Sequence, residues 1–258
     1  MELIVFIFGL FFGSFANVCI YRLPKGKSIV YPGSFCPYCN KPIRWYDNIP
    51  VLSYIFLKGK CRNCKKSISI RYPIVELLTG ISFLLIFKKF GLSVATPIYI
   101  FLCLCLIIIS FIDIDTFLIS DIIVIPGIFM GLLLSFLFPQ IYNMDRIEGF
   151  LYSFAGILLG GGILIFLGII GKILFKKDAM GGGDVKLLGM IGAFLGWKSV
   201  FLTLFFGSLF GTLISLILIL LGKRKVDDLV PFGPYLAIGA FISILFKNYY
   251  FLGIILIN

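Results

Sequence analysis

The chain has 258 residues, of which 60% are hydrophobic and only 14% are charged, and its formal net charge is +11. Soluble domains are roughly half apolar and a quarter charged, so this composition excludes an ordinary soluble domain and indicates a protein of the lipid bilayer. The absence of histidine excludes catalysis by a Ser–His or Cys–His pair and any metal site with a histidine ligand.

Eight apolar runs along the chain predict membrane-crossing helices, because about 20 apolar residues span the ~30 Å hydrocarbon core. The first run begins with Met-Glu, and no small-residue cleavage site follows it. We therefore expect an uncleaved transmembrane helix and not a signal peptide. We therefore predict an all-α polytopic membrane protein with about eight transmembrane helices. The runs are 3–20, 73–87, 94–112, 122–138, 150–175, 185–195, 200–221 and 231–246, with 249–257 expected to continue the last.

The basic residues predict the orientation, since short cytoplasmic loops are enriched in Lys and Arg. Of the 23 basic residues, 18 lie in segments 22–72, 113–121, 172–186 and 222–229, which share one side if all eight runs cross. We expect these segments in the cytoplasm and both termini outside. The positive charge then indicates topology and attraction to anionic lipid, with the bilayer as partner and no nucleic acid. If the short sixth run enters and leaves the membrane on the same side, all segments that follow it lie on the opposite side from the one predicted here.

Segment 22–72 carries two C-x-x-C pairs, with 21 residues between the inner cysteines. This spacing predicts a zinc-ribbon-like insertion with four thiolate ligands. Disulfides are disfavoured in the reducing cytoplasm. A basic segment of only about 50 residues needs a cross-link to fold, so the zinc is expected to be structural. Redox dithiol chemistry is the alternative. The four ligands are Cys36, Cys39, Cys61 and Cys64.

Acidic residues gather at two places on the predicted cytoplasmic side. "FIDIDTFLISD" supplies Asp113, Asp115 and Asp121 at the end of the third run, and Asp184 begins the sixth. Two carboxylates that share a proton provide a general acid and a general base together. Residues two apart lie roughly 200° apart around a helix, so only one of Asp113 and Asp115 can face Asp184. The alternative is that all these groups cap helix ends in interfacial water.

Three glycines, Gly181, Gly182 and Gly183, precede Asp184. Without Cβ atoms they would let a substrate backbone lie beside the carboxylates. Irregular backbone at membrane depth is tolerated only where it is buried in protein or lines a wet cavity. Lys186 follows on the next turn, where it would either orient a carboxylate at the substrate site or face anionic headgroups.

These motifs resemble the type IV prepilin leader peptidase family. "GGGD" is similar to the G-x-G-D signature of intramembrane aspartyl proteases. The blocks "FGSFANVCIYRLP", "RYPIVELLTG", "FIDIDTFLISD" and "AMGGGDVKLLG" occur in the order of that family. The resemblance implies an aspartic endopeptidase with Asp113 and Asp184 as its pair. It also implies cleavage of the basic leader of prepilins or pseudopilins at the cytoplasmic face of the bacterial inner membrane.

The resemblance further implies a second activity, methylation of the new N-terminal amine with S-adenosylmethionine, tied to the N-terminal cysteine-bearing region. We expect a first helix over 1–21, the insertion over 22–72 and a peptidase core over 73–258. Asn17, Arg22, Arg71 and Glu76 flank the insertion and are candidates for cofactor binding, or else interfacial anchors and interhelical hydrogen bonds. An ion-coupled transporter and a non-catalytic scaffold with a zinc ribbon are the alternative functions.

Overall fold

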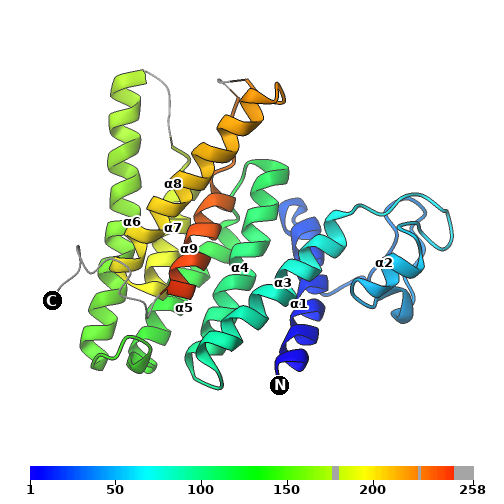
Figure 1. Ribbon diagram of the computed structural model, residues 1–258, viewed down its shortest axis with the longest axis horizontal. Helices are drawn as coiled ribbons and strands as arrows, with labels where there is room; N and C mark the ends of the chain where they lie inside the picture. The colour runs from blue at the N-terminus through cyan, green and yellow to red at the C-terminus, as the bar shows by residue number, and fades with distance from the viewer. Residues whose placement is uncertain (176–179, 226–227, 247–258) are drawn as a thin grey trace. The chain divides into compact units, whose positions relative to one another are not determined.

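A computed structural model describes residues 1–175, 180–225 and 228–246 of the chain. Over these residues the regular elements are helices, together with two isolated β-bridges. The chain divides into two compact units, Met1–Ile112 and Asp113–Asn258. Figure 1 shows the course of the helices.

In the N-terminal unit, helix α1 (Glu2–Arg22) packs antiparallel against α3 (Arg71–Phe90). Two glycines of α1 allow the close approach. A Cβ on Gly9 would lie 2.8 Å from the Cα of Gly80, and one on Gly13 would lie 2.6 Å from the Cα of Glu76. Small residues permit this distance between membrane helices, so a larger side chain here would force the pair apart.

The segment that joins α1 to α3 contains only short elements. The bridges pair Phe35 with Pro42 and Lys60 with Ser67. Helix α4 follows α3 and is joined to it by a short turn, where the rings of Phe90 and Tyr99 lie 4.9 Å apart. The elements are η1 (Leu23–Lys25), η2 (Trp45–Asn48), α2 (Leu52–Phe56) and α4 (Ala95–Thr116), of which α4 runs across the boundary between the units.

In the C-terminal unit, α7 is the central helix, since it contacts α5, α6, α8 and α9. Every residue from Leu187 to Leu195 is buried. Fourteen residues of helix extend only about 21 Å, short of the hydrocarbon core. Because α7 is buried among four other helices, its length need not match the thickness of the bilayer. The elements are α5 (Asp121–Leu137), η3 (Pro139–Ile141), α6 (Arg146–Phe175), α7 (Gly182–Leu195), α8 (Trp197–Leu220) and α9 (Gly233–Phe246).

Consecutive helices of this unit run in alternate directions. Gly156 of α6 meets Gly192 of α7, and Gly160 meets Leu188, so α6 and α7 are antiparallel. Helices α8 and α9 form a second antiparallel pair, because Gly207 lies against Tyr235 and Gly239 against the carbonyl of Thr203.

Helix α5 runs parallel to α7, with Gly127 against Met190 and Gly131 against Ala193. The rings of Tyr152 and Trp197, near the beginnings of α6 and α8, lie 6.3 Å apart, so these two helices are parallel as well. Helices that cross a membrane one after another must alternate in direction in this way.

One helix occupies each of the eight predicted apolar runs. By length and apolarity, however, the described residues contain four candidate spans: Glu2–Lys25, Ala95–Thr116, Arg146–Leu174 and Trp197–Leu220. Helices α5 and α9 are apolar but shorter, and α7 is shorter than the core is thick. The all-helical membrane architecture is thus confirmed, the number of eight crossings is not, and 249–257 lies outside the described residues.

Candidate active site and candidate metal centre

Asp113 and Asp184 lie together in the C-terminal unit. Asp113 is in the last turn of α4, is 4% exposed, and accepts a hydrogen bond on Oδ2 from the backbone N–H of Gly233 at 2.9 Å. Asp184 is in the first turn of α7, and its carboxylate lies within electrostatic range of Asp113. Three helices, α4, α7 and α9, therefore meet at this pair of carboxylates.

Two other acids from the same motif lie elsewhere. Asp115 is exposed, as the ~200° separation of positions two apart in a helix leads one to expect when Asp113 is buried. Asp121, at the start of α5, binds the ammonium of Lys186 through both oxygens at 2.9 and 2.8 Å. Both side chains of this pair are about half exposed, which is compatible with either role considered for Lys186.

The three glycines differ in what surrounds them. The carbonyl of Gly181 accepts the N–H of Asp184 at 3.1 Å, and a Cβ on Gly181 would lie 3.0 Å from Asp184 Oδ2. A Cβ on Gly183 would lie 2.8 Å from the Cβ of Ile119, whereas one on Gly182 would meet no heavy atom within 4 Å. Close packing thus requires glycine at 183, a methyl group at 181 would press on the Asp184 carboxylate, and position 182 is open.

A small cavity of about 210 Å³ adjoins the glycine turn, between the second half of α6 and the start of α7. Lys172 is the one charged residue among the side chains that line it. The lining residues are Leu164, Ile165, Gly168, Ile169, Lys172, Met180, Gly182 and Val185.

Such an arrangement is suited to acid–base chemistry. Two carboxylates at close range resist carrying two negative charges, so a pair of this kind holds one proton and offers one acid and one base. The N–H of Gly233 holds one oxygen of Asp113 in place. Sequence reasoning did not identify Gly233, whose only signal is its position between two prolines in "PFGPYL".

In the N-terminal unit, the four cysteines of the insertion form one cluster. The sulfur atoms of Cys36, Cys39, Cys61 and Cys64 all lie within 4.8 Å of one another, and those of Cys36 and Cys64 are 3.8 Å apart. A tetrahedral zinc site with Zn–S bonds of about 2.3 Å has sulfur–sulfur edges of roughly 3.8 Å. The donor set therefore fits zinc.

Each C-x-x-C pair lies in the same kind of tight hairpin. The N–H of Cys36 donates to the carbonyl of Lys41 at 3.0 Å, and that of Cys61 donates to Lys66 at 2.9 Å. The backbone N–H groups of Cys64 and Asn63 lower the pKa of the Cys61 thiol to about 6. Beside the other three thiols, the pKa of Cys64 in the same hairpin is raised to about 11. Metal binding requires the thiolate form of both residues.

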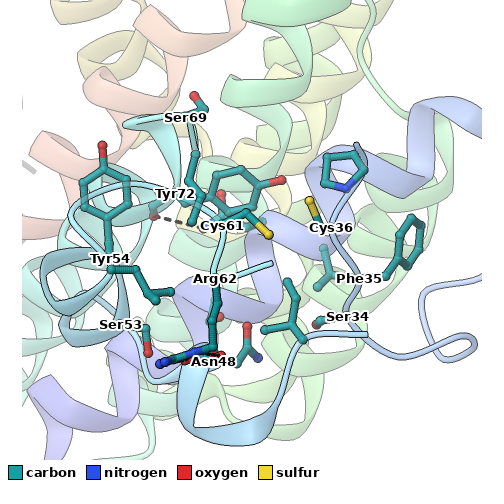
Figure 2. A pocket seen from close by; sticks show the side chains of 18 of the residues that line it. Ser34, Phe35, Cys36, Asn48, Ser53, Tyr54, Cys61, Arg62, Ser69 and Tyr72 are labelled. Carbon is teal, nitrogen blue, oxygen red and sulfur yellow. Dashed lines mark hydrogen bonds and ion pairs between the residues drawn. The ribbon is translucent and has the colours of Figure 1, made fainter. Parts of the chain in front are cut away.

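A cavity of about 1000 Å³ lies between α1, the start of α3 and the cysteine-bearing segment. Figure 2 shows its wall, with Tyr54, Tyr72, Cys36, Cys61 and Arg62 around the hollow. All four residues predicted as cofactor candidates line it: Asn17, Arg22, Arg71 and Glu76.

Asn17, Arg22 and Glu76 also make structural hydrogen bonds. Asn17 Nδ2 donates to the carbonyl of Tyr72 at 3.0 Å, while its Oδ1 is buried without a partner among the described residues. The guanidinium of Arg22 donates to two backbone carbonyls of the insertion, each at 3.0 Å. Glu76 accepts the N–H of Val51 at 2.7 Å. Val51 was not identified from the sequence, which carries no signal for it.

Two family models match the chain. The bacterial peptidase A24 N-terminal domain matches residues 7–90, and the type IV leader peptidase family matches residues 100–216. No solved structure matches.

Several curated proteins called "Prepilin leader peptidase/N-methyltransferase" are similar to the chain over most of its length. The protein from Aeromonas salmonicida is 36% identical over 95% of this chain and 90% of its own. That from Pseudomonas aeruginosa is 34% identical over 94% of this chain and 89% of its own. The protein from Neisseria gonorrhoeae is 34% identical over 92% of this chain and 87% of its own.

Proposed function

The chain belongs to the type IV leader peptidase family, as its motifs predicted, and we propose that it is a membrane aspartic endopeptidase that removes the basic leader from prepilins or pseudopilins. The observation that carries this proposal is that Asp184 lies near enough to the buried Asp113 for the two charges to interact, where α4, α7 and α9 meet. A transporter would need such carboxylates near the bilayer midplane, whereas these lie at helix ends, and a scaffold would leave the pair unexplained.

In the proposed reaction, the ionised carboxylate takes a proton from the attacking water and the protonated one donates to the leaving nitrogen of the scissile amide. Gly233 holds Asp113 so that its second oxygen stays available. Gly181, Gly182 and Gly183 form a turn without side chains beside Asp184, which leaves room for the substrate backbone to reach the two carboxylates. Lys186 supports the site through Asp121 by joining the starts of α5 and α7.

Incubation of the purified protein with a synthetic prepilin tests the peptidase. Asp113→Asn and Asp184→Asn are each expected to lower the cleavage rate by about 10²- to 10⁴-fold, the usual effect of losing general acid–base catalysis. Asp115→Asn, on the exposed side of the same helix turn, should cleave like the wild type. Full cleavage activity in Asp184→Asn would refute the assignment. So would a result in which Asp115→Asn no longer cleaves the prepilin while Asp113→Asn still does.

We propose that the chain also methylates the new N-terminal amine, with the 1000 Å³ cavity as the site of S-adenosylmethionine. That compound supplies an electrophilic methyl group on a sulfonium sulfur. The lining fits it: Arg22 and Arg71 would face its carboxylate, Tyr54 and Tyr72 offer flat surfaces for adenine, and Asn17 Oδ1 is an acceptor in need of a donor. A mass measurement of the product peptide, with and without the methyl donor, reports this activity separately from cleavage.

The cysteine cluster is proposed as a structural zinc site. All four sulfur atoms gather at one point, which a single redox C-x-x-C pair would not require. We expect about one zinc ion per purified chain by elemental analysis. A protein that folds essentially free of zinc would favour dithiol chemistry instead.

The remaining proposals concern placement. We propose eight crossings in the bacterial inner membrane, both termini outside, and the divisions 1–21, 22–72 and 73–258, with the active site and insertion facing the cytoplasm. The alternate helix directions and the basic residues of 22–72 support this. Reporter fusions after Gly26 and after Asn143 should report opposite sides of the membrane.

A further inference from the structure

Glu76 is a buried carboxylate in the wall of the large cavity. It lies in the second turn of α3 and is 7% exposed. Its Oε2 accepts the N–H of Val51 at 2.7 Å. The side chain of Ser14 is a second hydrogen-bond donor to this carboxylate. A carboxylate offers about four acceptor positions, and a buried one is costly unless other groups satisfy it, so two donors leave Glu76 with capacity for a ligand.

The bond from Val51 is made by strained backbone. Val51 has φ 61° and ψ −51°, and the N–H of Leu52 donates to the carbonyl of Pro50 at 2.6 Å, which closes a γ-turn around Val51. A β-branched residue rarely adopts positive φ. Strain of this kind persists where the surroundings impose it, and it is concentrated at ligand sites.

The charges around the cavity make Glu76 distinctive. The lining contains two carboxylates, and the other one, Asp47, already binds Arg62 with N–O distances of 2.6, 2.8 and 3.1 Å. A cationic group that enters this basic cavity is therefore drawn to Glu76. The cations of the lining are Arg22, Lys41, Arg44, Arg62, Lys66 and Arg71.

We propose that Glu76 is the ammonium-binding group of the cavity and the base for methyl transfer. This inference rests on the proposed methylation. Oε1 accepts an N–H of the ammonium freed by leader cleavage and takes up that proton, because an ammonium has no lone pair with which to attack. The amine nitrogen then bonds to the methyl carbon as the carbon–sulfur bond breaks, the sulfur keeps the electron pair, and Glu76 returns its proton to water.

Peptide binding tests the recognition directly. Two peptides with the mature N-terminal sequence, one with a free amine and one N-acetylated, are titrated into the full-length protein. The wild type should prefer the free amine by about tenfold or more, the usual strength of a hydrogen bond to a charged group. Glu76→Gln should lose the preference, and Glu2→Gln, an exposed carboxylate of the same unit, should keep it. A purely structural role for Glu76 would not change this ratio.

The methyl donor carries an amino group of its own, which Glu76 could bind in place of the peptide ammonium. Binding of S-adenosylhomocysteine, which has the same amino group, distinguishes these two ligands. Unchanged affinity in Glu76→Gln supports the proposal, whereas lost affinity with the peptide preference intact overturns it. Equal binding of both peptides to the wild type overturns it whether or not the variant folds.

Rates complete the test. With normal zinc content, Glu76→Gln should transfer methyl groups roughly 10²-fold more slowly, and an unchanged rate would refute its role as a base. If the wild type cleaves but transfers no methyl group, the proposed methylation itself fails, a result distinct from failure at Glu76.

Discussion

The backbone N–H of Gly233 donates to Oδ2 of Asp113 at 2.9 Å, although 120 positions separate the two residues. The first residue of α9 thereby holds a carboxylate of α4. Helix α9 is therefore part of the candidate active site and not only a packing element of the membrane domain.

Replacement of Gly233 by alanine should impair this contact without removing the donor. The new Cβ would lie 2.8 Å from Asp113 Oδ2, so the carboxylate must move. Because a displacement of about 1 Å at a catalytic group can cost 10²-fold, we expect cleavage to slow by about 10- to 100-fold. Gly162→Ala, where a Cβ meets open space, is the control. Equal cleavage rates in the two variants would contradict the prediction.

The glycine turn should tolerate alanine at one position and not at its neighbour. Gly183→Ala places a Cβ 2.8 Å from Ile119 and should displace Asp184 on the next residue, whereas Gly182→Ala meets nothing. We expect a large loss of prepilin cleavage in the first variant and near wild-type cleavage in the second. If Gly182→Ala were the more damaging, the middle glycine would have to contact the substrate directly.

The contact between α6 and α7 should be sterically sensitive. A Cβ on Gly156 would lie 2.3 Å from the carbonyl oxygen of Gly192. Overpacking of this kind costs about 1–3 kcal/mol, so Gly156→Ala should lower the unfolding temperature in detergent. Gly162→Ala on the same helix should not lower it, and a similar decrease in both variants would show that this contact is not the cause.

The Lys186–Asp121 ion pair should act by holding the starts of α5 and α7 together. Its two side chains are 45% and 52% exposed, so its loss should cost no more than about 1 kcal/mol. Lys186→Asp alone should reduce cleavage, and the double exchange with Asp121→Lys should recover most of it. If Lys186 instead binds substrate, the double exchange will remain as slow as the single variant.

Zinc retention should depend on pH, because protons compete with the metal for the four thiolates of the cluster. Within one hairpin the pKa of Cys61 is lowered to about 6 by backbone N–H groups, whereas that of Cys64 is raised to about 11 beside the other thiols. The loss of zinc on acidification is therefore expected of the four-thiolate site as a whole. After dialysis at pH 5, we expect much less zinc by elemental analysis than after dialysis at pH 7.5. Equal zinc content at both values would contradict this prediction.

The sequence alone determined those features that depend on neighbouring residues. Apolar runs must form helices, because the backbone has no other hydrogen-bond partner in lipid, and all eight runs do so. The C-x-x-C spacing likewise predicted a cluster whose sulfur atoms do gather. Four ordered motifs predicted the family that the comparisons show.

Only the tertiary structure decided which of these residues meet. Periodicity shows that Asp113 and Asp115 point different ways, but it cannot show which one faces Asp184, since that depends on how α4 is rotated against α7 and α9. The bond from Val51 to Glu76 likewise joins a strained loop to a helix that follows it. Contacts between distant segments follow from the packing of whole helices, and no local pattern in the chain records that packing.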